Sequence, residues 1–450
     1  MNAQPRATVV IVNWNGERLL RSCLDALARQ QTSAPFLTWV VDNASADGSL
    51  ALLEREYPDV RVLRNDANLG FAGGNNTALR QVSTPYAVLL NNDATPEPDW
   101  LEQLLAPFEL PGSERLGAVT SKVVFQPRFL RLSLSTPGFC PGDLDPRELG
   151  LRLHALCIEG VDVTERVLME RLTWGAEGEG AGRFRWTRTA GELLVPLPDG
   201  HPGPFEVSVR WGAEADKTAT LSWEGGSAEL PVTSTSSEQT FDIPAGVATY
   251  DVVNNVGSIV TRSGYGADRG YQDVDSGQYD AREDVFALCG CAVAFRTEAG
   301  RAVDWFDDDF FLYYEDTDLS WRLRAAGWGI AYEPKAVVRH VHSASTVEWS
   351  PTFMFHTTRN RVLMLVKNAS AEQARREYAA FVAETLRLAR PVVGALRRGR
   401  RPAAGALVFR LKVLRSLLRL TPAALRHRRA ISRTAEVPRS ELEQWLVASR

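Results

Sequence analysis

The chain has 450 residues, of which 44% are hydrophobic, 24% charged and 9% aromatic. These proportions are typical of globular proteins, and they exclude wholesale disorder, collagen-like repeats and a polytopic membrane protein. The net charge of −4 is unevenly spread: residues 371–450 hold 18 Lys and Arg against 6 Asp and Glu, a charge of +12, which leaves −16 for residues 1–370.

The five cysteines are odd in number and show no CxxC spacing, which argues against a disulfide framework and a zinc knuckle. The first residues, MNAQPRATVVIVNWNG, contain no apolar segment ahead of a cleavage site, and no run of about 18 uncharged apolar residues follows. We therefore expect a cytoplasmic protein.

The first 125 residues alternate between strand-like and helix-like patterns. A continuous β-branched run at residues 8–12 precedes a helical apolar spacing at 18–28. The same alternation follows at 37–41 and 48–57, at 60–63 and 75–82, and at 86–90 and 100–108. Four strand–helix units predict an α/β fold with a parallel sheet covered on both faces.

Polar side chains follow each of these four strands. In parallel sheets ligands bind beyond the carboxyl ends of the strands, so these positions are candidates for binding, although Asn, Asp and Ser also form turns and helix caps there. The residues are Asn13 and Asn15; Asp42, Asn43 and Ser45; Asn65, Asp66 and Asn68; and Asn91, Asn92 and Asp93.

The pattern changes near residue 131. Short strand-like stretches separated by Gly, Pro and Asp turns predict a β-sandwich-like domain inserted at 131–248. After it we expect a strand at 285–295, a helix at 318–326, a strand at 336–341 and a mostly helical end. The expected domains are 1–130 and 249–368 (the two halves of the α/β domain), 131–248 (the insert) and 369–450 (a basic helical tail).

Three motifs contain residues suited to catalysis. Asp93 in Asn91-Asn92-Asp93 could hold a divalent cation together with substrate phosphates, or cap a helix. Glu315, Asp316 and Asp318 stand before an amphipathic helix, where a carboxylate could accept a proton from a hydroxyl, or simply act as a capping acid. His340 and His342 end a strand, as metal ligands or structural residues.

Together these segments resemble the inverting family 2 glycosyltransferases with a GT-A fold, particularly the rhamnosyltransferase-like branch. The resemblance covers about half of the chain, at roughly residues 6–127 and 250–368. It is carried by VVIVNWNG (9–16), VVDNASADGS (40–49), NDANLGFAGGNN (65–76), LLNNDATPEPDWL (89–101), GCAVAFR (290–296), FLYYEDTDLSWRLRAAGW (311–328) and HVHSAS (340–345).

The resemblance implies a nucleotide-sugar donor, a glycan or lipid-linked glycan acceptor, and Mg²⁺ or Mn²⁺. Asp93 matches the last position of the family's DxD motif, which here begins with Asn; His340, rather than His342, matches the strand-end histidine that would share the metal. Asp316 matches the catalytic base, with Glu315 beside it. The residues expected to bind the nucleotide sugar are Asn13, Asn15, Asp42, Asn43, Asn68, Gly70, Asn75, Asn92 and Asp93.

The expected function is thus an inverting, metal-dependent hexosyltransferase of cell-envelope polysaccharide assembly, with dTDP-rhamnose suggested by the branch. Phe310, Phe311, Tyr313 and Tyr314 could wall its site or fill the core. The competing hypotheses are a nucleotidyltransferase and a catalytically silent glycan-binding scaffold. No glycine-rich phosphate loop with Lys follows the first strand of this chain, which argues against the nucleotidyltransferase.

The insert and the tail lie outside the resemblance. Trp174, Trp186, Trp211 and Trp223 in the insert could stack on sugars or fill a core. In residues 396–429 apolar and basic side chains alternate at helical spacing, which suits either a peripheral contact with the inner face of the cell membrane or a helix packed on the enzyme. Few aromatics and an acidic body argue against a nucleic-acid partner.

Overall fold

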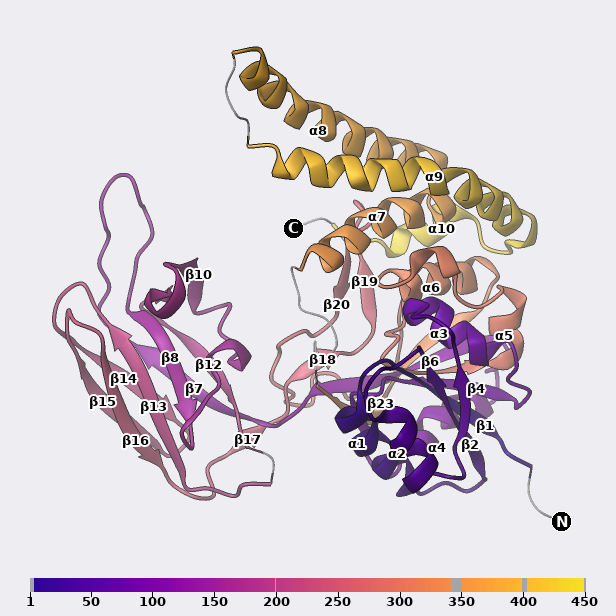
Figure 1. Ribbon diagram of the computed structural model, residues 1–450. Helices are drawn as coiled ribbons and strands as arrows, with labels where there is room; N and C mark the ends of the chain where they lie inside the picture. The colour runs from indigo at the N-terminus through magenta and orange to yellow at the C-terminus, as the bar shows by residue number, and fades with distance from the viewer. Residues whose placement is uncertain (1–3, 199, 342–349, 399–402, 449–450) are drawn as a thin grey trace. The chain divides into compact units, whose positions relative to one another are not determined.

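A computed structural model describes residues 4–198, 200–341, 350–398 and 403–448. The chain forms two compact units (Figure 1). Unit 1 comprises residues 1–124, 253–271 and 276–450, and unit 2 comprises residues 125–252 and 272–275. The predicted insert, 131–248, lies within unit 2.

Unit 1 is built on a mixed β-sheet. Its strands run in the order β21-β23-β6-β22-β4-β1-β2-β3, with β5 paired to β23 and β18 paired to β6. The parallel part pairs β3 with β2, β2 with β1 and β1 with β4, whereas β22 is antiparallel to both β4 and β6. The strands are β1 (Ala7–Asn13), β2 (Phe36–Asp42), β3 (Arg61–Arg64), β4 (Tyr86–Leu90), β5 (Ala94–Pro96), β6 (Leu116–Phe125), β18 (Val253–Asn255), β21 (Glu283–Asp284), β22 (Ala292–Arg296) and β23 (Gly329–His340).

Helices cover both faces of this sheet. One core cluster joins the sheet to α1 (Glu17–Ala28), α2 (Ser49–Glu56) and α4 (Trp100–Leu105). A second cluster joins the other face to α3 (Gly70–Leu79), α5 (Thr297–Ala302) and α6 (Glu315–Ala325). Strands β1 and β4 are buried almost throughout, as their continuous apolar runs require. The predicted α/β class with helical layers on both faces is confirmed.

Several expected elements differ from the structure, among them the strand expected at 336–341, which is the longer β23, Gly329–His340. Helix α3 begins at Gly70, five residues before the predicted start, in a glycine-rich stretch that propensity alone disfavours. The strand expected at 285–295 is reduced to β22. The backbone N–H groups of Leu288, Cys289 and Gly290 donate to side chains of Ser320, Thr120 and Asp316, so they are not used in a strand ladder.

Unit 2 consists of two antiparallel sheets over one core. One sheet has the order β10-β11-β8-β13-β16 with β9 paired to β8, and the other has β12-β7-β14-β15 with β17 paired to β7. The strands are β7 (Phe129–Ser135), β8 (Arg152–Ile158), β9 (Val161–Asp162), β10 (Thr173–Glu177), β11 (Phe184–Thr187), β12 (Ala190–Pro196), β13 (Phe205–Gly212), β14 (Lys217–Trp223), β15 (Gly226–Val232), β16 (Ser237–Ile243) and β17 (Thr249–Tyr250). The β-sandwich-like architecture matches the prediction.

The four tryptophans of unit 2 do not form an exposed aromatic surface. Trp211 and Trp186 are 2% and 8% exposed. Trp174 lies under the guanidinium groups of Arg188 and Arg147, and Trp223 stacks on Phe241 at 5.9 Å between ring centroids. Trp186 and Trp211 therefore fill the core, as one of the two alternatives had it, and the aromatic argument for sugar binding does not apply to them.

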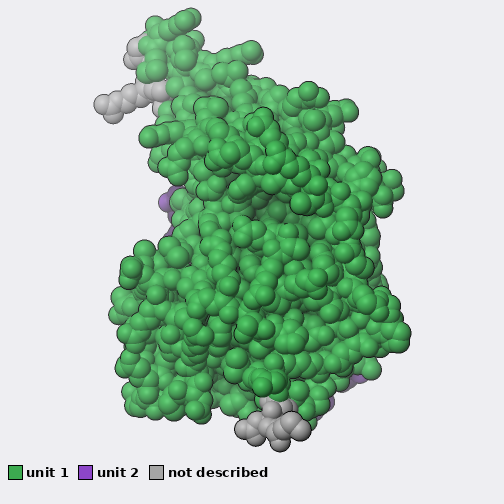
Figure 2. Space-filling view, turned by 90° about the vertical axis from the view of Figure 1, so that its right-hand side faces the viewer, with its two compact units in different colours: residues 1–124, 253–271, 276–450 green, residues 125–252, 272–275 purple. Residues whose placement is uncertain are grey.

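The C-terminal helices are part of unit 1. They are α7 (Pro351–Asn368), α8 (Ala371–Arg397), α9 (Gly405–Thr434) and α10 (Arg439–Leu442), and a short hairpin of β19 (Ser258–Val260) and β20 (Gly266–Asp268) precedes them in the chain. Buried side chains of α7 and α9 form one cluster with Trp321 of α6. Figure 2 shows unit 1 as a continuous surface from the α/β layers to these helices. No helix among the described residues is long and apolar enough to cross a membrane.

One face of the basic tail thus packs on the α/β domain. Val413, Leu417 and Ala424 of α9 are at most 3% exposed within that cluster. The packing alternative is therefore correct for this face of the helix. The opposite face is exposed.

Candidate functional site

Asn13 and Asp42 end adjacent parallel strands and are direct partners in the β1–β2 register. Asn92, after β4, donates from Nδ2 to Oδ1 of Asn13 at 2.8 Å, which connects the end of β4 to the end of β1. Asp42 is 2% exposed; its Oδ2 accepts from the backbone N–H of Ser45 at 3.1 Å. Its Oδ1 is buried and has no hydrogen-bond partner within the described ranges. A buried, unsatisfied carboxylate oxygen at this edge is suited to accept a hydrogen bond from a ligand.

A second set of polar contacts continues along the same edge. Asn43 donates from Nδ2 to the carbonyl of Gly70 at 3.0 Å, and Asn68 accepts the N–H of Gly70 at 2.8 Å. Asn15 accepts the N–H of Ala46 at 2.7 Å and has φ 50°, which places a non-glycine residue in the left-handed region. The structure therefore brings together all the predicted polar residues at the ends of β1 and β2.

Gly70 joins this polar network to the segment around Phe311. Its φ is +70°, and a Cβ there would lie 2.3 Å from the carbonyl oxygen of Phe311. That same oxygen accepts the N–H of Phe71 at 2.7 Å, at the start of α3. Only glycine permits this close approach of two backbones.

Asp93 and His340 meet because β5 pairs with the end of β23. Oδ1 of Asp93 lies 3.1 Å from Nε2 of His340, and Nδ1 of His340 lies 3.1 Å from Oδ1 of Asn254. Both side chains are largely buried, at 7% and 12% exposed. A carboxylate fixed beside an imidazole is a pair of metal ligands, or an ion pair when the imidazole is protonated.

The donor set fits a divalent cation only in part. Within the described part of the chain, no group of three or more His, Cys, Asp or Glu side chains is arranged to hold an ion. Asp93 and His340 would supply two ligands, so further ligands would have to come from a substrate and water. Mg²⁺ is commonly bound in this way, through one or two carboxylates and substrate phosphates.

Asp316 lies in the first turn of α6 and faces the loop before β22. Its Oδ1 accepts the N–H of Thr317 at 2.6 Å, and its Oδ2 lies 3.4 Å from the N–H of Gly290. Burial raises the pKa of Asp316, and the negative charge of Asp268 adds to the rise. A carboxylate with a raised pKa is a stronger proton acceptor than an ordinary aspartate.

Glu315 precedes Asp316 but has a different environment. It is 6% exposed, and its Oε2 has no hydrogen-bond partner among the residues that the structure covers. Burial, followed by the charge of Asp316, raises its pKa well above the ordinary value. Glu315 is therefore disposed to hold a proton.

A strained turn leads into this helix. Phe311 has φ 63° and ψ −62°, and the N–H of Leu312 donates to the carbonyl of Phe310 at 2.7 Å, which makes a γ-turn. Tyr313 and Tyr314 follow with φ 68° and 69°. Three strained residues within four positions cost free energy, and such strain clusters at functional sites.

Two residues of α7, not predicted from the sequence, hold this turn. Asn360 is fully buried, and its Nδ2 lies 2.9, 2.9 and 2.7 Å from the carbonyl oxygens of Phe310, Leu312 and Tyr313. Arg359 donates to the carbonyls of Asp309 and Phe310 at 2.8 and 3.0 Å. The only sequence signal was an Arg-Asn pair inside an apolar helical pattern.

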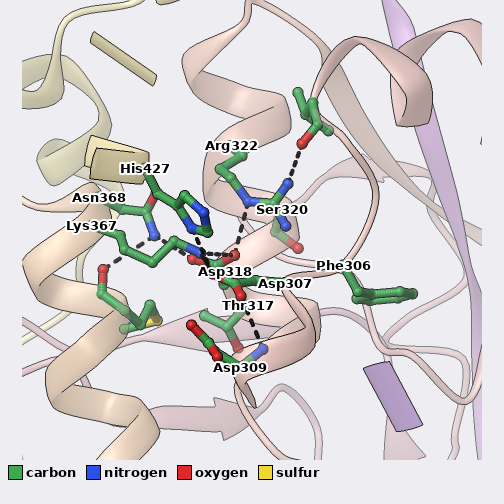
Figure 3. Close-up of polar contacts among 12 residues, drawn as sticks. Phe306, Asp307, Asp309, Thr317, Asp318, Ser320, Arg322, Lys367, Asn368 and His427 are labelled. Atoms are coloured by element: carbon green, nitrogen blue, oxygen red, sulfur yellow. Dashed lines mark hydrogen bonds and ion pairs between the residues drawn. The ribbon is translucent and has the colours of Figure 1, made fainter. Parts of the chain in front are cut away.

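Asp318 belongs to a buried charge network rather than to the site edge (Figure 3). Its Oδ2 lies 2.8 Å from Nζ of Lys367 and 2.8 Å from Nε of Arg322, and its Oδ1 accepts from Asn368 at 2.8 Å. Lys367 also contacts Asp307, which His427 of α9 approaches at 3.0 Å. The positive partners keep the pKa of Asp318 below its ordinary value despite burial. This network fixes α6 against α7 and α9.

Some expected site residues have other roles or are not described. Asn75 is buried and donates to the carbonyl of Phe71 within its own helix at 2.9 Å, so it does not join the polar edge. Phe310 is 1% exposed and lies in the core, whereas Phe311 stacks on His356 at 5.2 Å between ring centroids. His342 lies outside the described residues.

Two segments of the chain, which together contain the residues of this edge, match known protein families. Residues 8–122 match the model of Glycosyl transferase family 2, and residues 245–359 match that of Glycosyltransferase like family 2. A segment of 59 residues is 42% identical to N-acetylglucosaminyl-diphospho-decaprenol L-rhamnosyltransferase of Mycobacterium tuberculosis (strain ATCC 25618 / H37Rv), and covers 13% of this chain and 19% of that protein.

Two further similarities are more distant. A segment of 92 residues is 30% identical to the teichoic acid poly(glycerol phosphate) polymerase of Staphylococcus epidermidis, and covers 20% of this chain and 13% of that protein. The crystal structure of GalNAc-T7 with UDP, GalNAc and Mn²⁺ aligns over 97% of this chain and 59% of that chain, with 11% identity and a TM-score of 0.47. The matched segments span from about a tenth to two fifths of the length of the curated relatives.

The two family-model matches together take in about half of the chain, and they contain Asp42, Asp93, Asp316 and His340. The sheet of unit 1, parallel from β3 to β4 and with β22 antiparallel to both β4 and β6, has the GT-A architecture that the resemblance implied. The α/β part of this chain is therefore a glycosyltransferase family 2 domain, interrupted between the two matched segments.

Proposed function

We propose that this protein transfers a single sugar, with inversion, from a nucleotide-sugar donor to a hydroxyl of a glycan or lipid-linked glycan in the assembly of a cell-surface polysaccharide. The observation that carries the proposal is the buried carboxylate of Asp42, whose Oδ1 is unsatisfied at the carboxyl ends of the parallel strands. A nucleoside offers hydroxyl and N–H donors for this oxygen. Asn13, Asn43 and Asn68 would shape the same pocket.

The donor sugar is proposed to be rhamnose, carried by dTDP. Support comes from the 59-residue similarity to the rhamnosyltransferase named above, which agrees with the resemblance of the motifs. The same relative acts, by its name, on a lipid diphosphate sugar, which motivates the lipid-linked acceptor.

Asp93 and His340 are proposed to hold Mg²⁺ or Mn²⁺ with the donor diphosphate. When bound there, the cation would supply positive charge to the departing diphosphate. Asp93 and His340 are held by the pairing of β5 with β23, so their carboxylate and imidazole are positioned before the donor arrives.

Asp316 is proposed as the general base. It would take the proton of the acceptor hydroxyl while the hydroxyl oxygen forms a bond to the anomeric carbon. The bond from that carbon to the donor phosphate breaks, and the nucleoside diphosphate leaves with both electrons. One carboxylate suffices for this single displacement, and the raised pKa of Asp316 suits the role.

The scaffold hypothesis finds less support. It assigns glycan binding to the insert, where Trp186 and Trp211 are buried. It also leaves the raised pKa of Asp316 and the strained turn before it without a purpose.

The test is release of nucleoside diphosphate from a nucleotide sugar in the presence of an acceptor, followed by determination of the anomeric configuration of the product. We expect Asp316→Asn to lower kcat by about 10²–10⁴-fold with little change in donor affinity. Asp309→Asn is the matched control, because its side chain is exposed in the same segment. Equal rates for both variants, or retention of configuration, would refute the assignment.

A further inference from the structure

The chain contains a long segment without acidic residues. Between Glu384 and Glu436 there is no Asp or Glu, whereas 13 Arg and one Lys occur. The second half of α8 and all of α9 lie within this segment. The two helices run antiparallel as a hairpin at the end of unit 1 (Figure 1). Their surface is therefore strongly positive on a molecule whose other residues are net negative.

The same helices carry a concentration of exposed apolar side chains. Of the sixteen large hydrophobic residues that are exposed in the described structure, seven lie in α8 and α9. Leu386 and Leu418 are 62% and 61% exposed, and Leu411 is 48% exposed. Soluble surfaces normally show such residues singly, so their grouping marks an interaction site.

Exposed apolar side chains, leucine or valine, alternate with arginines along one side of each helix. We define the hairpin face as Leu386, Arg390 and Val393 of α8 together with Leu411, Arg415 and Leu418 of α9. In each helix these positions follow i, i+4, i+7 spacing and so share one side. All six residues are exposed.

The three residues on α8 and the three on α9, which form one stripe on each helix, point to the same side of the hairpin. The helices contact each other through Tyr378 and Thr385 of α8 and through Arg410 and Thr421 of α9. At about 100° per residue, each stripe lies roughly 100° from these contact positions in the same rotational sense. Because the helices are antiparallel, equal rotations bring both stripes to one common face.

We propose that the hairpin face docks on an anionic lipid bilayer. Leucine side chains would enter the boundary between headgroups and acyl chains, while the arginines pair with lipid phosphates beside them. The absence of acidic residues from 385 to 435 and the i, i+4, i+7 alternation of Leu and Arg both favour this occupant over a protein partner. Only the purpose of docking, access to a lipid-linked acceptor, rests on the proposed function.

The test is co-flotation of the full chain with vesicles of phosphatidylcholine, with and without about 30% phosphatidylglycerol. We expect binding to the anionic vesicles only, and weaker binding as salt is raised. Replacing Arg390 and Arg415 by Gln should lower the affinity by about thirtyfold, since each basic residue near an anionic surface contributes about fivefold. Leu386→Gln combined with Leu411→Gln and Leu418→Gln should abolish flotation.

The control replaces exposed leucines outside the hairpin, with Leu110→Gln and Leu144→Gln, and should float like the parent protein. Thermal stabilisation by a nucleotide sugar should be the same in all variants, so loss of docking is distinguishable from loss of donor binding. Equal flotation of the leucine variant and the control would overturn the proposal. So would a stable dimer that the leucine variant dissociates, in protein that does not float with anionic vesicles.

Discussion

Asn360 offers a direct test of how the strained turn is maintained. In Asn360→Leu the side chain keeps its branching and its number of non-hydrogen atoms, but the amide that faces the carbonyls of Phe310, Leu312 and Tyr313 is lost. The carbonyls of Leu312 and Tyr313 lose this donor, whereas the carbonyl of Phe310 keeps the guanidinium of Arg359. Each unsatisfied group costs about 1–3 kcal/mol, and we expect a loss of about 2–4 kcal/mol in the free energy of unfolding.

The loss of the Asn360 amide should also lower the rate of the reaction. The γ-turn at Phe311 and the positive φ angles of Tyr313 and Tyr314 persist only while contacts around them over-determine the backbone. Once relaxed, the turn would no longer present Asp316 in its place, and kcat should fall about 10–100-fold with a smaller change in KM for the donor.

Urea unfolding and steady-state kinetics of the same preparations provide the measurement. Thr357→Ala is the control, because it removes a side-chain hydrogen bond on the same helix, to the carbonyl of Phe353, without touching the turn. It should cost about 1 kcal/mol or less and leave kcat unchanged. An Asn360→Leu protein with the stability and kcat of the control would refute the reasoning.

Three further predictions concern buried charges. Lys367→Met should destabilise the protein by about 3–5 kcal/mol, measured by urea unfolding, because it removes the buried positive charge that Asp307 and Asp318 share and leaves them their contacts with His427, Arg322 and Asn368. The pKa of Glu315 is raised in the native state, so the parent protein loses free energy of unfolding as pH rises above the pKa of an unfolded glutamate. Glu315→Gln lacks this ionisation and should become more stable relative to the parent over that range. Parallel curves of unfolding free energy against pH would contradict this. Asp268→Asn should move the acidic limb of the kcat/KM profile to lower pH, since removing this charge lowers the pKa of Asp316; an unmoved limb would exclude Asp316 as the titrating base.

The parallel half of the fold was predictable because its signals are local. Buried strands such as β1 and β4 read as continuous apolar runs, and the polar residues after them follow from strand direction alone. Asn13 and Asp42 could therefore be assigned to one edge without knowing any contact.

The remaining parts depend on contacts between distant segments. Residues 285–291 look like a strand, but three of their N–H groups bond to side chains 26 to 169 positions away. Asp318 could not be separated from Asp316 by sequence, because its partner Lys367 lies 49 residues further on. The early start of α3 could not be predicted, because its first turn contains glycines, which have low helix propensity. Gly70 is needed there because a Cβ would collide with the carbonyl oxygen of Phe311.

The central claim is that unit 1 binds a nucleotide sugar through Asp42 and Asp93. Its most direct test is thermal stabilisation of the full chain by a panel of dTDP, UDP and GDP sugars, with and without Mn²⁺ or Mg²⁺. A ligand that binds only the native state raises stability by mass action, by about 2.7 kcal/mol at a hundred times its Kd. We predict a shift selective for one nucleotide, dependent on the cation, lost in Asp42→Asn and Asp93→Ala and kept in Asp316→Asn. No shift with any donor, in protein shown to be folded, would contradict the account.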